Sequence, residues 1–436
     1  MDAAQAGQDA TPLPKRARHF LLLQGPCGVF FRELQKSLLR SGHKCTRVVL
    51  NGGDLVNSLF GKSLIYKRAF ADWPAWIAAT AAREKITDLV IYGDCRPYHR
   101  AAMAQLKPLG IRVHVLEEGY LRPNWVTCEA EGVNGNSVFT KLDLDAVDST
   151  GLDPYDPGKE AQIRGSHIRY MITGFSYYCW TWFLTPLFPR YVSHRELDII
   201  GEAALWLGRL FSKPLRKNRT KHALRNIEQL GKPVHLVLLQ LNGDSQIKEH
   251  SRFSSVRHFV EFCIAEFAAS RTTESLLVFK NHPLDNGVIN FTRLIREEQA
   301  RYGLSGRVFF VETSKLVPLL EKSISVTAVN STACHQALRR GIPTMVLGEA
   351  IFNHPHIVPR MRLADFFRLR PRKDTAHYEK LVSLLRMTCQ FNGGYYSPQG
   401  WQTLLPSLTA AMLDDPPAIL AEVKSRASQQ APRKAS

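Results

Sequence analysis

Short apolar runs that break at a polar turn and lead into an amphipathic helical pattern recur in two separate stretches of this chain. The first stretch extends from His19–Gln24 to Ile111–Leu116, and the second extends from Pro233–Gln240 to Pro343–Leu347. In the second stretch the pattern predicts a helix over Ser255–Ala269, a strand over Val308–Val311 and, after Asn330-Ser331-Thr332, a helix that reaches Arg340. Strands and helices alternate in this way when parallel strands are joined by crossover helices. The sequence therefore predicts an α/β fold with two Rossmann-like lobes that face a cleft.

On this pattern the chain divides into five segments. We expect a flexible N-terminal tail at 1–18, a Rossmann-like lobe at 19–140, a connecting region at 141–230, a second Rossmann-like lobe at 231–405, and a C-terminal helix with a flexible tail at 406–436. Open α/β sheets bind ligands outside the carboxyl ends of their strands. The polar residues that follow each strand are therefore the first candidates for a functional site.

Basic residues outnumber acidic ones, with 57 Lys and Arg against 39 Asp and Glu and a net charge of +18. Such an excess favours an anionic partner, which can be a nucleic acid, an acidic lipid surface or a phosphorylated substrate. The eight cysteines form no C-x-x-C pair, which argues against a zinc ribbon and fits reduced thiols. The apolar run Phe20–Leu23 is too short for a signal peptide, so we expect a cytoplasmic protein.

Carboxylates follow the strand-like runs in both lobes. Glu117 and Glu118 come directly after the run that ends at Leu116, where two adjacent carboxylates suit acid/base chemistry at a cleft. A solvated turn explains the same pair equally well. Asp244 follows the first strand of the second lobe, where its carboxylate could attack or steer a cationic centre, although an Asx turn is the simpler alternative.

Two further groups at strand ends of the second lobe are suited to an anion. Lys280 and His282 combine a cation with a histidine, although a lone histidine is more often structural. Asn330-Ser331-Thr332 lies between a strand and a helix, where hydroxyls and free N–H groups can bind an anion or form a plain N-cap. Neither His282 nor Asp244 belongs to a metal-spaced cluster, and the sequence contains no P-loop, G-x-G-x-x-G or G-x-S-x-G motif. We therefore expect no metal and no cofactor.

The connecting region contains an aromatic run beside a basic run. Tyr170–Pro189 has no charged residue and is rich in aromatics, which prefer the headgroup layer of a membrane to its hydrocarbon centre. Seven cations follow between Arg209 and Arg225. This pairing predicts a segment that docks on an acidic membrane surface. Alternatively, the aromatics pack as core between the lobes and the cations form a solvated face.

Several strings of the sequence resemble the KpsS/LipB-type capsule polysaccharide proteins, over roughly residues 18–405. They are Leu23-Gln24-Gly25-Pro26, Asn51-Gly52-Gly53-Asp54, Tyr92 to His99, Glu117 to Pro123, Asp244 to Ile247, Lys280 to Pro283 and Asn330 to Thr332. The strings Gly-Asp-Cys-Arg-Pro-Tyr-His and Glu-Glu-Gly-Tyr-Leu-Arg-Pro are specific, whereas the His-Pro and Asn-Ser-Thr pieces are individually weak. Residues 348–367 depart from the pattern expected of the family.

The resemblance implies a GT-B-like retaining β-Kdo glycosyltransferase, peripheral on the inner face of the inner membrane. It would transfer Kdo from CMP-Kdo to a (lyso)phosphatidylglycerol-type lipid and so initiate the poly-Kdo linker of a capsular polysaccharide. The first lobe would face the acceptor and the second would bind the CMP-sugar. The implied partners are capsule biosynthesis and export proteins, including a second, polymerising β-Kdo transferase, and no nucleic acid.

The resemblance also implies roles for individual residues. Asp244 corresponds to the nucleophile and Glu117 to the acid/base, with Glu118 in reserve. The donor-binding residues would be Lys280, His282, Asn330, Ser331, Thr332 and Gln246. The acceptor-side residues would be Gln24, Gly25, Asp94, Arg96, Tyr98, His99, Tyr120 and Arg122. Net retention calls for two successive inversions, which one carboxylate on each lobe could provide.

Two other classes of protein fit parts of the pattern. One is a non-catalytic capsule assembly or export scaffold at the inner membrane, which would release no CMP from CMP-Kdo. The other is a nucleic-acid-binding protein. The basic residues lie beside the aromatic run and do not accompany a base-stacking sheet, which argues against that second class.

Overall fold

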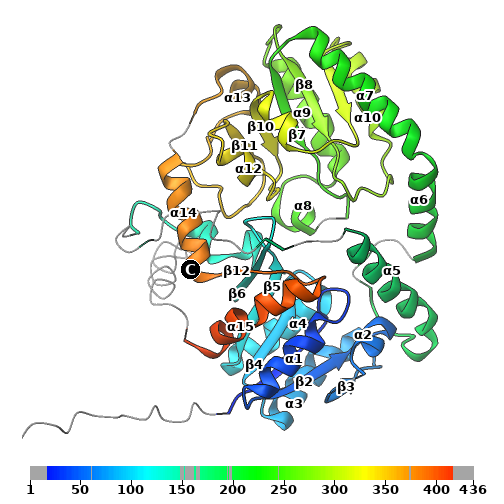
Figure 1. Cartoon of the computed structure of the whole chain (residues 1–436), viewed down its shortest axis with the longest axis vertical. Coiled ribbons are helices and arrows are strands. Elements are labelled where there is room, and N and C mark those ends of the chain that lie inside the picture. The colour runs from blue at the N-terminus through cyan, green and yellow to red at the C-terminus, as the bar shows by residue number, and fades with distance from the viewer. Residues whose placement is uncertain are drawn as a thin grey trace, which may run out of the picture.

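The computed structural model describes residues 17–415 apart from 60, 148–151, 153–161, 164–166, 194, 196–198, 244 and 373–374. It contains two sheets, one of seven strands in the order β12-β6-β5-β4-β1-β2-β3 and one of five in the order β11-β10-β7-β8-β9. Helices flank each sheet, and the two lobes are stacked in Figure 1. The expected α/β fold with two Rossmann-like lobes is confirmed.

The first lobe has a parallel centre and an antiparallel edge. Its sheet is formed by β1 (His19–Leu22), β2 (Lys44–Val49), β3 (Ser63–Ile65), β4 (Asp88–Tyr92), β5 (Arg112–Glu118) and the antiparallel β6 (Trp125–Ala130). The helices before β6 are α1 (Phe30–Arg40), α2 (Gly52–Asn57), α3 (Trp73–Glu84) and α4 (Pro97–Leu106). Alternate residues of β1 enter different cores, with Leu21 on one face and Phe20 and Leu22 on the other. Helices therefore cover both faces, as a parallel sheet requires.

The second lobe is parallel throughout. Its strands are β7 (Val234–Leu238), β8 (Leu276–Lys280), β9 (Val308–Val311), β10 (Ser323–Ala328) and β11 (Thr344–Val346). Its helices are α8 (Ser245–His250), α9 (Val256–Ala269), α10 (Phe291–Arg301), α11 (Val317–Glu321), α12 (Cys334–Leu338), α13 (Leu363–Leu369) and α14 (Thr375–Thr388). Several boundaries match the sequence pattern closely, for example α9, whose N-cap is Ser255.

The end of the chain returns to the first lobe. β12 (Gln390–Asn392) pairs antiparallel with β6, and α15 (Pro398–Leu413) packs beside α1 with Leu404 and Leu408 in the same core as Phe30. The second lobe therefore ends before Gln390, and the boundary expected at residue 405 is wrong. The chain crosses between the lobes a second time through α14 (Figure 1).

The lobes share a continuous apolar core. Tyr120 and Phe139 from the first part of the chain belong to the same buried cluster as Leu236, Val326 and Tyr378 from the second lobe. His354 also donates from Nε2 to the backbone oxygen of Phe139 at 2.9 Å. Large buried contact areas of this kind fix the relative position of two lobes.

The connecting region forms helices along one side of both lobes. These are α5 (His167–Phe183), α6 (Ile199–Phe211) and α7 (Lys213–Leu230), shown in green in Figure 1. Tyr177 of α5 is buried and donates to the Oδ1 atom of Asp54 at 2.8 Å, so this helix is fastened to the first lobe. No helix in the described part of the chain is both long and apolar enough to cross a membrane.

The aromatic and basic runs are only partly core. Tyr177 and Phe188 are buried, but Phe175, Trp182 and Phe183 are each more than half exposed. The alternative in which the aromatics fill a core between the lobes therefore does not hold for most of the described run. Arg209, expected among the membrane-facing cations, instead faces the second lobe and pairs with the carboxylates of Asp285 and Glu312, as described below.

Candidate functional site

Glu117 and Glu118 form the last two residues of β5, not a turn after it. Glu117 accepts at Oε1 from the backbone N–H of Glu118 at 2.9 Å, and Glu118 accepts at Oε1 from the hydroxyl of Tyr92 at 3.2 Å. Tyr395, from the segment between β12 and α15, donates to the backbone oxygen of Glu117 at 2.9 Å. The two carboxylates are therefore held at the carboxyl edge of the first sheet, next to the antiparallel strand β6.

The carboxyl group of Glu117 is a weaker acid than an ordinary glutamate. Burial raises its pKa to about 7, and the nearby charge of Glu118 acts in the same direction. The N–H bond from Glu118 and the charges of Arg122 and Arg96 oppose this rise without cancelling it. A carboxyl group that titrates near neutral pH can both accept and return a proton, which is the requirement for general acid/base chemistry.

The second lobe presents His282 after the end of β8. Its Nδ1 atom accepts from the backbone N–H of Leu284 at 3.1 Å, so in the neutral ring the proton lies on Nε2. Burial lowers the pKa of His282 to about 4, and the charges of Arg122 and Lys280 add to this effect. His282 is therefore a neutral ring with one N–H available to an acceptor such as a phosphate oxygen. The charge of Arg122, a residue of the first lobe, thus acts on a group of the second lobe.

The other expected donor-side residues line neighbouring strand ends. Lys280 ends β8 and is buried, which lowers its pKa, and its Nζ atom donates to the backbone oxygen of Asn281 at 3.0 Å. Asn330 follows the end of β10 and Gln240 follows the end of β7, and the two residues form two hydrogen bonds with each other. Since β7 lies between β10 and β8, these residues occupy one edge of the sheet.

The turn at Ser331 and Thr332 is more compact than the sequence suggested. The Oγ atom of Ser331 accepts from the backbone N–H of Ala333 at 3.3 Å, and α12 begins only at Cys334 and ends at Leu338. The helix that we expected to reach Arg340 is thus a short one, so its dipole adds little to anion binding. The hydroxyls of the turn, not the helix end, are the groups suited to an anion.

Two expected site residues cannot be placed. Asp244 lies outside the described residues, as does the side chain of Gln246 on α8. The role of Asp244 as nucleophile stays a prediction.

Several of the expected acceptor-side residues are buried. Tyr98 lies in the core with Trp73, and Tyr120 donates to the Oε1 atom of Glu129 at 2.6 Å. Gln24 donates to Asp54 at 3.2 Å, while Asp94 accepts from the N–H of Val133 at 3.0 Å. We expected these residues on the acceptor side of the site. Their side chains are buried and bond or pack within the first lobe, and their role toward an acceptor stays a prediction.

His99 and Gly93 position Glu117. The fully buried ring of His99 donates from Nδ1 to the backbone oxygen of Gly93 at 2.8 Å. Gly93 has a φ of +70°, and a Cβ atom added to it would lie 3.4 Å from Oε2 of Glu117. Arg96 lies over the ring of Tyr92 and donates to the backbone oxygen of Gly25 at 3.4 Å. Within the Gly-Asp-Cys-Arg-Pro-Tyr-His string, Gly93 therefore lies beside the carboxylate of Glu117, and His99 holds the backbone of Gly93.

Helix α8 contacts the first lobe at two points. Arg100 pairs with Glu249 at 2.9 Å, and Nε2 of His250 lies 3.7 Å from Sγ of Cys95. Neither His250 nor Tyr395 was expected at the site. His250 carried no sequence signal, whereas the string Asn392-Gly-Gly-Tyr-Tyr396 contains a Gly-Gly turn before two aromatics that could have drawn attention to Tyr395.

One group of side chains in the described residues has the composition of a metal site. Asp145, His356 and His377 bring their ligand atoms within 4.8 Å of one another. The carboxylate of Asp145 is already bonded to Nε2 of His377 at 2.8 Å and to Nε2 of His356 at 2.9 Å. These residues could hold a divalent cation, and without one they form a hydrogen-bonded contact between the connecting region and the second lobe.

Comparisons with known proteins agree on one family. Residues 87–396 match the family described as capsule polysaccharide biosynthesis protein. The chain is 30% identical over 380 residues to the Escherichia coli protein named capsule polysaccharide export protein KpsS, covering 87% of this chain and 97% of that one. It is 27% identical over 399 residues to the Neisseria meningitidis capsule polysaccharide modification protein LipB, covering 88% and 93% of the two chains. Among solved structures, the β-Kdo 2,7 transferase of Thermosulfurimonas dismutans KpsC aligns at a TM-score of 0.42 and 11% identity, over 91% of this chain and 99% of that one.

Proposed function

Because this chain belongs to the capsule polysaccharide biosynthesis protein family, we propose that it is a retaining glycosyltransferase that moves Kdo from CMP-Kdo to a phosphatidylglycerol-type lipid. The identities of the sugar, the donor and the acceptor in this proposal come from the motif resemblance. The observation that carries the proposal is Glu117, a carboxyl group with a pKa of about 7 at the end of β5. The charge of Arg122 acts on Glu117 and also on His282 of the second lobe. This charge therefore acts both on the proposed acid/base and on the proposed phosphate ligand.

The proposed reaction has two steps. The carboxylate of Asp244 attacks the anomeric carbon of Kdo, and the bond to the CMP phosphate breaks. Glu117 then takes the proton of the acceptor hydroxyl, whose oxygen attacks the same carbon and releases Asp244. Each step inverts the anomeric centre, so the configuration is retained overall.

The second lobe would bind the donor. His282 offers its Nε2–H to a phosphate oxygen. At neighbouring strand ends Lys280 adds a positive charge, and Ser331 and Thr332 add hydroxyl groups that can donate. A neutral N–H donor keeps the phosphate bound without transferring a proton to it, because the pKa of His282 is about 4. The carboxylate that Kdo carries beside its anomeric carbon would be drawn to Arg122.

The pH dependence of transfer follows from Glu117. Glu117 must be ionised to accept the proton, and its pKa of about 7 means that half of the molecules are protonated near neutral pH. We expect kcat/KM to rise with pH and to level off above about pH 7. Glu117→Gln should abolish the rising part of this pH profile. A profile that is flat between pH 5.5 and 8.5 in the unmodified enzyme would contradict this assignment.

A non-catalytic export role is the second candidate, because the Escherichia coli relative is named an export protein. The two candidates differ in one measurement, the release of CMP from CMP-Kdo in the presence of a lipid acceptor. Release above the rate of spontaneous hydrolysis favours the transferase.

We also propose that α5, α6 and α7 dock the protein on an anionic membrane surface. The large apolar side chains of these helices that are more than half exposed are Met171, Ile172, Phe175, Trp182 and Phe183 on α5, Leu207, Leu210 and Phe211 on α6, and Leu215 on α7. Exposed cations follow on α7, namely Lys213, Lys217, Arg219, Lys221 and Arg225. Exposed aromatics beside cations match the headgroup layer of an anionic bilayer, where each cation contributes about 1 kcal/mol.

Vesicle flotation tests this surface. Phe175→Ser combined with Phe183→Ser should reduce the binding of phosphatidylglycerol vesicles by about tenfold or more, because two large apolar side chains lose their burial in lipid. Raised salt should weaken the remaining electrostatic part. The matched control is Leu109→Ser with Leu369→Ser, two exposed leucines outside α5 to α7. Equal flotation of both double variants and the unmodified protein would contradict the proposal.

A further inference from the structure

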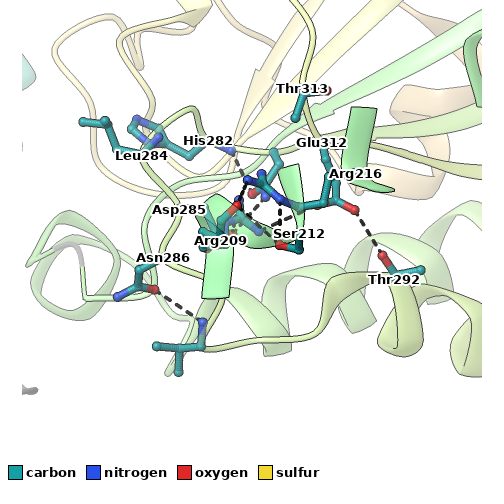
Figure 2. A network of polar contacts seen from close by, with 12 residues as sticks. Arg209, Ser212, Arg216, His282, Leu284, Asp285, Asn286, Thr292, Glu312 and Thr313 are labelled. Atoms are coloured by element: carbon teal, nitrogen blue, oxygen red, sulfur yellow. Dashed lines mark hydrogen bonds and ion pairs between the residues drawn. The ribbon is translucent and has the colours of Figure 1, made fainter. Parts of the chain in front are cut away.

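A cavity of about 320 Å³ lies between α6, the start of α7 and the strand ends of β8 and β9. Figure 2 shows its polar side, where Arg209 lies between Asp285 and Glu312. The distance from Arg209 to the carboxylate is 3.2 Å for Asp285 and 3.7 Å for Glu312. Arg219 approaches Glu312 at 3.6 Å.

The charges that line this cavity do not balance. Three arginines, Arg209, Arg216 and Arg219, face two carboxylates, Asp285 and Glu312. Arg216 donates to the backbone oxygen of Arg209 at 2.6 Å and to Oγ of Ser212 at 3.3 Å, both neutral acceptors. Burial lowers the pKa of Arg216, and the charge of Arg209 lowers it further. The cavity therefore has one surplus positive charge, which a ligand with a single negative charge would neutralise.

The cavity is amphipathic. Its remaining wall includes Phe291, Phe310 and Ile289. The residues of α6 that line it, Ala204, Leu205, Gly208 and Arg209, follow helical spacing on one face, and Ser212, the N-cap residue of α7, comes next. The neighbouring face of α6 carries the exposed Leu207, Leu210 and Phe211. An apolar chain bound at the cavity can therefore continue onto the surface proposed to enter the membrane.

The cavity adjoins the proposed donor site through one turn. Asn281 donates from Nδ2 to Asp285 at 2.9 Å and accepts at Oδ1 from the backbone N–H of His282. Asn281 and Asp285 line the cavity, while His282 lies between them in sequence. Gly287, with a φ of +83°, allows the loop to approach Arg209, because a Cβ atom there would lie 3.1 Å from its Cδ atom.

We propose that this cavity binds the phosphodiester headgroup of a single-chain phospholipid. A phosphodiester carries one negative charge, which matches the surplus, whereas a phosphomonoester such as CMP carries up to about two. The cavity is at the lower limit of small-molecule sites, about 300–1,000 Å³, so it holds a headgroup while the acyl chain leaves along α6. This inference rests on the proposed function, since it names the subsite of the lipid acceptor.

Binding without turnover tests the inference. The probes, used below any micelle concentration, are a short-chain lysophosphatidylglycerol, its deacylated form glycerophosphoglycerol, a monoacylglycerol of the same chain length, and CMP. Arg216→Gln with Arg219→Gln should weaken lysophosphatidylglycerol binding by at least about tenfold, as expected for lost charge-assisted hydrogen bonds. CMP affinity should stay within about twofold. Arg216→Lys with Arg219→Lys should recover part of the loss, because it keeps both charges.

The control is Arg296→Gln with Arg301→Gln, two exposed cations of α10 that do not line the cavity and lie outside α5 to α7. If the double glutamine variant unfolds, Arg219→Gln alone serves, because that side chain is 43% exposed. Unchanged lysophosphatidylglycerol affinity in the variants would overturn the inference. So would a loss confined to CMP, which would assign the cavity to the donor, or a monoacylglycerol that binds as tightly as the phospholipid. Arginine-dependent lipid binding without any Kdo transfer would instead contradict the proposed function and leave the cavity assigned.

Discussion

Replacing Glu117 by Gln is expected to lower the turnover number for Kdo transfer by about three orders of magnitude, within the usual range for a general acid/base. The amide keeps the size and the hydrogen bond from the N–H of Glu118 but cannot accept a proton from the acceptor. Affinity for CMP should be nearly unchanged, because donor binding is proposed for the second lobe. Steady-state kinetics with CMP titration separates these two quantities.

Glu118→Gln is the matched control, since it removes a carboxylate from the adjacent residue of the same strand. It should lower turnover much less than Glu117→Gln, with a small effect through the lost charge beside Glu117 and the bond from Tyr92. If Glu118→Gln were inactive and Glu117→Gln active, Glu118 would be the acid/base.

Asp244→Asn is expected to abolish transfer while leaving the fold and CMP affinity largely intact. The substitution preserves the shape of the side chain but removes the charge that would attack the anomeric carbon. In the unmodified enzyme, acid quenching followed by peptide mass analysis should recover a peptide with Asp244 that carries one Kdo.

Glu249→Gln is the control for Asp244→Asn, because it changes a carboxylate on the neighbouring helix α8 that pairs with Arg100. It should keep most of the activity. Near-normal turnover of Asp244→Asn would remove Asp244 as nucleophile and, with it, the two-step account of retention.

The sequence predicted the strand ends well because buried parallel strands are short apolar runs bounded by turns. β9 has the bounds expected from the pattern, and Glu117 and His282 lie at strand ends as proposed. β12 could not be foreseen, since three residues carry no periodic signal and their partner strand lies more than 250 positions earlier. The return of α15 to the first lobe could not be foreseen either, because the helix α1 on which it packs also lies far earlier in the sequence.

Site residues were harder to predict than strands because a motif does not say which side chains point inward. Tyr98, His99 and Tyr120 occur in the specific strings and yet are buried. Arg209 was expected on the membrane side with the other cations. The helical spacing of α6 instead turns it toward Asp285, whose position in space the sequence does not reveal.

Mass spectrometry of a synthetic lysophosphatidylglycerol incubated with CMP-Kdo and the full-length protein tests the central proposal most directly. The account predicts a lipid product heavier by one or more Kdo residues, formed in step with the release of CMP and lost with Glu117→Gln. A lipid of unchanged mass beside intact CMP-Kdo, under conditions where the protein binds both, would contradict it.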